Sequence, residues 1–170
     1  KAEELRARLS KFVRVKLDDS ENSPGWKFAQ WEMKGVPLRL EIGPKDIENG
    51  QCVLVRRDNR EKTVVALDNL VESTQQMLKD FAKAIYEKAK ANLEGNITPA
   101  HNIQEMKDIL QKRVGFVKAM WCGDEHCEEV IKNETGMPSR CIPFEQEHID
   151  DVCPVCGKPA KYMVIFGIAY

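Results

Sequence analysis

Four cysteines in two spaced pairs constrain this 170-residue chain more than any other feature. Cys122 and Cys127 are five positions apart, and Cys153 and Cys156 form a C-P-V-C turn followed by Gly157 and Lys158. Two such pairs can bring four thiolates around one tetrahedral Zn²⁺. A glycine after the last cysteine accepts a positive φ, so that backbone N–H groups can point at sulfur. The spacing therefore favours a zinc site.

Two alternatives to zinc are a redox C-x-x-C pair and unrelated buried cysteines. A redox pair prefers a helix N-terminus, whereas Cys156 runs into Gly-Lys-Pro, which is a poor start for a helix. Cys52 and Cys141 lie in strand-like sequence, where a thiol behaves as a small apolar residue, and His126 could replace one thiolate. The pairing favours four thiolates, which leave no open coordination position, so the predicted site is structural. The predicted ligands are Cys122, Cys127, Cys153 and Cys156.

Charge and hydropathy exclude several classes of protein. The 26 basic and 27 acidic residues give a net charge of -1, which is unlike a generic basic nucleic-acid binder. An RNA reader that works through a few placed side chains remains compatible with it. No apolar run approaches the roughly 20 residues of a membrane span. The opening KAEELRARLS lacks an apolar signal core, so we expect a cytoplasmic protein whose cysteines stay reduced.

Hydrophobic periodicity predicts two domains, 1–70 and 71–170. The helices expected from the pattern cover residues 1–11, 25–34, 68–95 and 103–112. The expected strands of the first domain cover residues 12–17, 36–42, 51–57 and 62–67, the last two joined as a hairpin. Beyond residue 112 we expect short strands and cysteine-bearing turns.

The segment GWKFAQWEMKGVPLRLEIGPKD concentrates charges of both signs around a helix end, a strand and a turn. These charges are Glu32, Lys34, Arg39, Glu41, Lys45 and Asp46. A carboxylate beside a Lys or Arg complements the Watson–Crick edge of guanine, which offers N1–H and N2–H donors next to the O6 acceptor. The alternative is a solvated face with local ion pairs, which composition alone favours. The arginines at 56, 57 and 60 either contact phosphate or are surface residues of the hairpin without a role in binding.

Several motifs in the same order resemble one family. GWKFAQWEMKGVPLRLEIGPKD, then CVLVRRD, then the cysteine spacing and the closing FGIAY resemble prolyl-tRNA synthetase, in the form that carries a C-terminal zinc domain. The resemblance extends over nearly the whole chain. It implies a class II anticodon-binding α/β domain, with a mixed sheet flanked by helices and its opening strand missing. A small α+β zinc-binding domain would follow.

The resemblance also implies roles for particular residues. The anticodon guanines would be read by Glu32, Arg39, Lys45 and Asp46. The zinc ligands would be Cys122, Cys127, Cys153 and Cys156, with Cys141 at a non-ligand position. The carboxylate of Tyr170 would fold back toward the catalytic domain. That domain, with its ATP and Mg²⁺, is expected upstream and is absent from this sequence, so the chain alone is expected to be inactive.

The sequence thus predicts the tRNA-recognising, zinc-binding part of an enzyme that activates proline with ATP. Its expected partners are proline tRNA, its own catalytic domain and a second copy in the full enzyme, but no membrane. One alternative is a zinc-bound protein-interaction scaffold that no longer binds RNA. Another is a thiol oxidoreductase built on Cys153 and Cys156.

Overall fold

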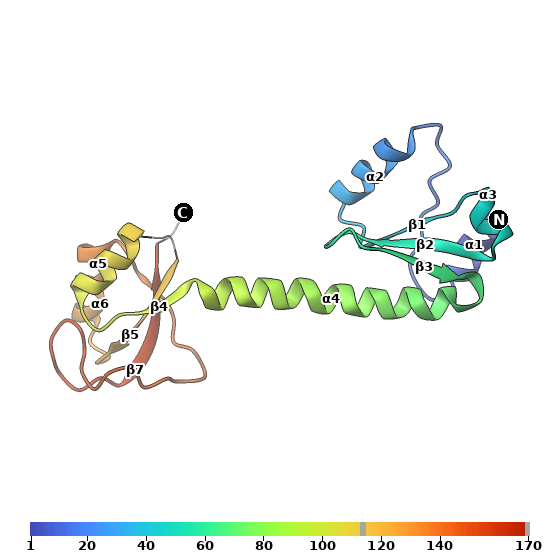
Figure 1. Ribbon diagram of the computed structural model, residues 1–170. Helices are drawn as coiled ribbons and strands as arrows, with labels where there is room; N and C mark the ends of the chain where they lie inside the picture. The colour runs from blue at the N-terminus through green and yellow to red at the C-terminus, as the bar shows by residue number, and fades with distance from the viewer. Residues whose placement is uncertain (113–114, 169–170) are drawn as a thin grey trace. The chain divides into compact units, whose positions relative to one another are not determined.

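The computed structural model describes residues 1–112 and 115–168 of the chain (Figure 1). Tyr170, predicted to approach a catalytic domain, lies outside these residues. The chain divides into two compact units, Lys1–Ala89 and Lys90–Tyr170. This division falls inside a long helix, whereas the predicted boundary near residue 70 coincides with the start of that helix. None of the helices in the described residues has the length and apolar character needed to cross a membrane.

The first unit contains one sheet and helices on both of its faces. Its elements are α1 (Ala2–Leu9), α2 (Pro24–Met33), β1 (Leu38–Glu41), α3 (Pro44–Glu48), β2 (Gln51–Arg56), β3 (Lys62–Ala66), a 3₁₀ turn η1 (Leu67–Asn69) and the part of α4 (Leu70–Gly95) that ends at Ala89. The strands lie in the order β1-β2-β3, and both pairings are antiparallel. The combination of α and β elements is as predicted. A mixed sheet would contain both parallel and antiparallel pairs, whereas the pairs in the described residues of this unit are antiparallel.

Strand alternation divides the residues of this sheet between two faces. One face buries Cys52, Leu54 and Val65 against Leu5 of α1 and Leu70 of α4. The other face carries Arg39 and Glu41 of β1, together with Lys62 and Val64 of β3, because Arg39 and Lys62 both lie opposite Val55. Helix α2 lies on this second side in Figure 1 and covers only part of it, since Val64 remains 60% exposed. The charged side chains therefore share an open sheet face.

Two predictions for the first unit were wrong. Residues 12–17 alternate as a strand does, but the chain forms none there; Val13 and Val15 pack against the core without strand pairing. The turn after β1 contains a short helix, α3, which was expected to be irregular. Its first residue is Pro44, whose missing N–H is tolerated at a helix start, and Asp46 caps it.

The second unit is an α+β domain, as predicted. Its elements are β4 (Ile97–Pro99), α5 (Ile103–Lys112), β5 (Phe116–Trp121), α6 (Glu125–Thr135), β6 (Ser139–Cys141) and β7 (Tyr162–Gly167). The sheet order is β4-β5-β7-β6, with β4 and β5 parallel and the other pairs antiparallel. Its core is formed by buried side chains of both helices and the central strands, including Met106, Ile131, Val117, Val164 and Phe166.

Helix α6 corrects the expectation that only strands and turns follow residue 112. Asp124 caps its start by accepting the His126 backbone N–H at 3.1 Å, and Gly136 ends it with a φ of 73°. Ile131 on its inner face is fully buried. Short strand β4 was also not predicted.

A close backbone approach at Gly115 gives the first prediction. A Cβ at this position would lie 2.5 Å from the Asn96 carbonyl oxygen, which also accepts the Phe116 N–H at 2.8 Å. Because backbone cannot swing aside, we expect Gly115→Ala to lower the free energy of unfolding by about 1–3 kcal/mol in a urea titration. Gly95→Ala is the matched control, since nothing beyond its own stretch of helix lies within 4 Å of the point that its Cβ would occupy. Equal stability of the two variants would contradict this account.

Candidate metal centre and nucleic-acid interface

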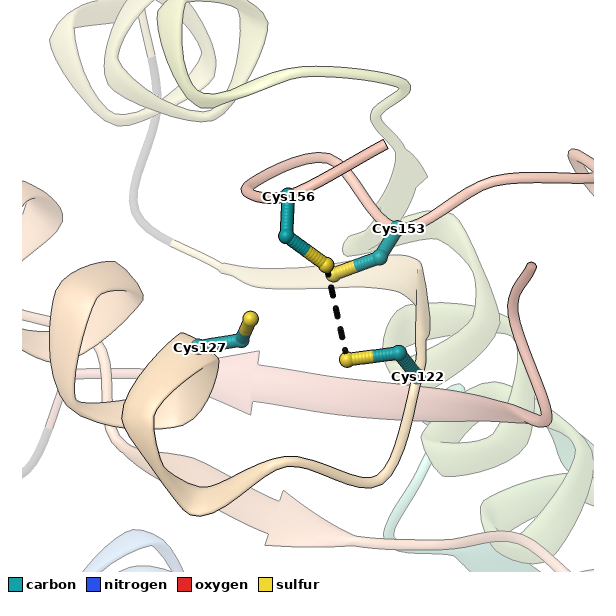
Figure 2. Close-up of side chains that lie close together, drawn as sticks. All are labelled: Cys122, Cys127, Cys153 and Cys156. Carbon is teal, nitrogen blue, oxygen red and sulfur yellow. Dashed lines mark hydrogen bonds between the residues drawn. The ribbon is translucent and has the colours of Figure 1, made fainter. Parts of the chain in front are cut away.

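Four cysteine thiols from three segments meet in the second unit. Cys122 follows β5, Cys127 lies in the first turn of α6, and Cys153 and Cys156 belong to the loop before β7 (Figure 2). Their Sγ atoms all lie within 4.8 Å of one another, and the Cys156 and Cys122 sulfurs are 3.7 Å apart. Two Zn–S bonds of about 2.3 Å at a tetrahedral angle separate sulfurs by about 3.8 Å. The donor set and its spacing therefore fit a tetrahedral metal ion.

The loop carrying Cys153 and Cys156 is closed by its own backbone. The Cys153 N–H donates to the Lys158 carbonyl at 2.9 Å, and the Gly157 N–H donates to the Cys153 carbonyl at 3.0 Å. Gly157 adopts a φ of 69°, as the sequence suggested. The Lys158 N–H donates to the Cys156 sulfur, and this bond is the main reason that the pKa of this thiol falls to about 7.

A second Cys-Gly turn follows β5. Gly123 has a φ of 90°, and the next N–H, that of Asp124, donates to the Cys122 sulfur. Burial outweighs that bond and raises the pKa of Cys122. The two turns therefore have the same geometry. In each, the glycine after a cysteine has a positive φ, and the N–H of the residue after the glycine donates to the sulfur of that cysteine.

Helix α6 places the remaining thiol. Cys127 is the third residue after the Asp124 cap, and its N–H donates to the Asp124 carbonyl at 3.0 Å. Burial is the first cause of a strongly raised pKa at Cys127, so the thiol stays protonated unless a cation compensates the thiolate. Cys127 was thus predicted correctly as a member of the cluster, but it lies on a helix and not in the predicted turn.

The other candidates for ligands lie elsewhere. Cys52 is fully buried in the core of the first unit, and Cys141 is exposed on β6. Within the described part of the chain, the one group of three or more potential ligands contains the four predicted cysteines and not His126.

The charges of the first unit form a separate cluster around Arg39. Its Nη1 lies 2.8 Å from Oε1 of Glu32 on α2, and its Nε lies 2.8 Å from Oε1 of Glu41 on the same strand. The guanidinium carbon stacks over Phe28 at 3.8 Å from the ring centroid. Sequence reasoning missed Phe28, although it lies four residues before Glu32 and therefore on the same helix face.

The other two predicted readers, Lys45 and Asp46, lie on α3. Asp46 accepts the Gly43 N–H at 2.9 Å and a longer bond from Gln51 at 3.5 Å. Lys45 is exposed, and its amine contacts no partner among the residues that the structure describes. The structure therefore joins Glu32 to Arg39 directly, places Asp46 at the cap of the next helix, and leaves Lys45 facing solvent.

The three arginines of the hairpin differ in their surroundings. Arg56 pairs with Asp58 at 2.7 Å. Arg57 lies with its guanidinium 5.4 Å from the Phe81 ring. Arg60 is 81% exposed in its side chain and approaches Glu32 at 3.9 Å. Arg60 is thus the most exposed of the three cations.

Comparison with known families covers both units. Residues 1–77 match the family described as an anticodon binding domain, and residues 103–170 match the family described as prolyl-tRNA synthetase, C-terminal. The two matches fall on different units, so each unit has a family of its own.

Individual relatives give the same result over the whole chain. The proline–tRNA ligase of Clostridium botulinum (strain Okra / Type B1) is 55% identical over all 170 residues, and that of Ruminiclostridium cellulolyticum is 54% identical. The crystal structure of prolyl-tRNA synthetase from Cryptosporidium parvum, complexed with L-proline and AMP, superposes with a TM-score of 0.91 at 39% identity over 99% of this chain. The chain spans 36% of the length of each of these proteins.

The cap of α6 gives the second prediction. Asp124→Ala removes the acceptor of the His126 N–H, so we expect the free energy of unfolding to fall by about 0.5–2 kcal/mol. Asp124→Asn retains an acceptor and is expected to match the parent chain. Both variants are compared by urea titration in one buffer. An alanine variant as stable as the asparagine variant would show that the cap contributes nothing.

Proposed function

This chain belongs to the prolyl-tRNA synthetase family, and from that premise we propose that its first unit recognises the anticodon of proline tRNA. The whole protein would attach proline to this tRNA with ATP. The observation that carries the proposal is the Glu32–Arg39 pair on an open sheet face, within the unit that matches the anticodon-binding family. A carboxylate and a guanidinium side by side complement the donors and the acceptor of guanine.

We assign base reading to Glu32, Arg39, Lys45 and Asp46. Arg39 and Lys45 supply donors for guanine O6 and N7. The carboxylates of Glu32 and Asp46 accept from N1–H and N2–H. The cap bond from Gly43 uses one oxygen of Asp46, and an ionised carboxylate offers about four acceptor sites, so capping and base recognition are compatible.

We infer that Cys122, Cys127, Cys153 and Cys156 hold one structural Zn²⁺. Support comes from the clustering of the four sulfurs and from the two backbone N–H donors at Cys122 and Cys156. Four thiolates fill a tetrahedral shell, so the ion would bind neither water nor substrate. ATP and Mg²⁺ would be bound by the catalytic domain of the whole protein.

The remaining partners follow from the same premise. We propose that the whole protein works in the cytoplasm, as tRNA synthetases do in general, and that its reducing conditions keep the four thiols available to metal. Within the whole protein this chain would adjoin its own catalytic domain, and two copies would form a homodimer.

The zinc assignment predicts metal content and its loss. The purified chain should contain about one zinc per molecule by elemental analysis, and Cys127→Ser should lose it. Cys141→Ser is the control and should retain the metal, because Cys141 lies outside the cluster. Chelator should reduce the far-UV circular dichroism of the parent chain, since metal binding contributes to folding. Rapid thiol reactivity in a metal-free chain would instead support the oxidoreductase.

The anticodon assignment predicts weaker RNA binding after loss of Lys45. Lys45→Ala should raise the Kd for proline tRNA by about 5- to 150-fold, which corresponds to a base contact of about 1–3 kcal/mol. Lys83→Ala on α4 removes another exposed lysine and should bind as the parent does. Filter binding with cognate and anticodon-changed tRNA measures both. Equal binding of the two tRNAs by the parent chain would defeat the assignment, and binding of neither tRNA would support the scaffold.

A further inference from the structure

Arg39 and four neighbouring side chains form a row of alternating charge. The row begins at Arg60 in the hairpin, whose Nη2 lies 3.9 Å from Oε2 of Glu32. Glu32 and Glu41 then flank Arg39 at 2.8 Å each. Lys62 of β3 ends the row, with its Nζ 3.6 Å from Oε2 of Glu41. Each carboxylate thus bonds Arg39 through one oxygen and faces an exposed cation with the other.

Arg39 is fixed on three sides by this arrangement. Its Nε donates to Glu41, its Nη1 donates to Glu32, and one face of the guanidinium stacks on Phe28. Its Nη2 has no partner within residues 1–112 and 115–168, and the side chain is 20% exposed. Since a guanidinium has five N–H donors, the two on Nη2 stay available to a ligand.

We propose that Glu41 and Phe28 are positioning residues, which hold Arg39 so that its Nη2 meets the acceptor edge of a guanine in the anticodon. The inference rests on the proposed function of the first unit. Glu41 acts from the same strand as Arg39, two residues away and on the same face, so the strand itself sets the geometry of this pair. Phe28 fixes the plane of the guanidinium.

The physical advantage is that Arg39 is ordered before RNA arrives. A free arginine side chain loses rotamer freedom when it is held in one geometry. Here that loss occurs when the domain folds, so it does not weaken RNA binding. The outer cations, Arg60 and Lys62, offset the two carboxylates that would otherwise repel the RNA backbone.

Glu41→Gln separates positioning from general electrostatics. The substitution keeps the size and an acceptor oxygen but removes the charge that holds Nε. We expect the ratio of Kd values for anticodon-changed and cognate proline tRNA to fall about fivefold, the effect of one modest hydrogen bond. Glu48→Gln, an exposed carboxylate on α3, is the control for lost negative charge and should leave the ratio unchanged or tighten both complexes.

A double-mutant cycle tests whether Glu41 acts through Arg39. In an Arg39→Ala background, Glu41→Gln should change the ratio no further. Phe28→Leu should lower the ratio as Glu41→Gln does, and Phe28→Tyr should restore it. Without RNA, the Arg39 Nε–H NMR signal should exchange slowly with water in the parent chain and faster in Glu41→Gln, because the neutral amide is a weaker acceptor than the carboxylate.

The outcomes that overturn the proposal are distinct from failure of the proposed function. If the parent discriminates between the tRNAs but Glu41→Gln leaves the ratio intact, Glu41 does not position Arg39. A further loss in the Arg39→Ala background would mean that Glu41 acts independently of Arg39, which also overturns the inference. If the parent chain does not discriminate, the proposed function itself fails, and the positioning role fails with it.

Discussion

The sulfur cluster is the point at which three segments of the second unit meet. Its four thiols come from the end of β5, the first turn of α6 and the loop before β7, and this loop lies more than twenty residues further along the chain than the other two segments. Three of these cysteines are buried, and burial raises the pKa of Cys122 and Cys127. An ion that draws four thiolates together would offset this penalty and convert metal affinity into stability of the domain.

The first unit depends on a different constraint, the two-residue period of its strands. The same alternation that buries Cys52 and Leu54 places Arg39 and Glu41 on the opposite face. A shift of one residue in the β1–β2 register would exchange these faces, burying charge and exposing the core. Core packing therefore keeps the charged row on the open face. A one-residue shift of β1 along β2 would expose Leu40 and bury the guanidinium of Arg39.

Much of this arrangement could be predicted from the sequence, and the errors have physical reasons. The cysteine spacing predicted a cluster because ligand pairs occur as short local turns. Residues 12–17 were predicted as a strand because alternation indicates a buried face, but it does not supply a pairing partner, and Val13 and Val15 pack without one. Helix α6 was missed although Asp124 and Gly136 are ordinary helix boundary signals, because the cysteine beside them suggested a turn. The contact between Glu32 and Arg39 crosses a loop, so no periodic pattern could predict it.

Both candidate sites share one property: neighbouring groups fix the charged or polar atoms in place before a ligand binds. The net charge of the whole chain is only -1. At the sulfurs, backbone N–H groups of Asp124 and Lys158 approach the thiols from turns that only a positive φ permits. Around Arg39, side chains of opposite sign alternate, so each member has an opposite charge within 3.9 Å. A chain organised in this way does not need a large positive field to bind RNA. Its discrimination would come from geometry fixed at folding, because the groups that contact the ligand are already held by their neighbours.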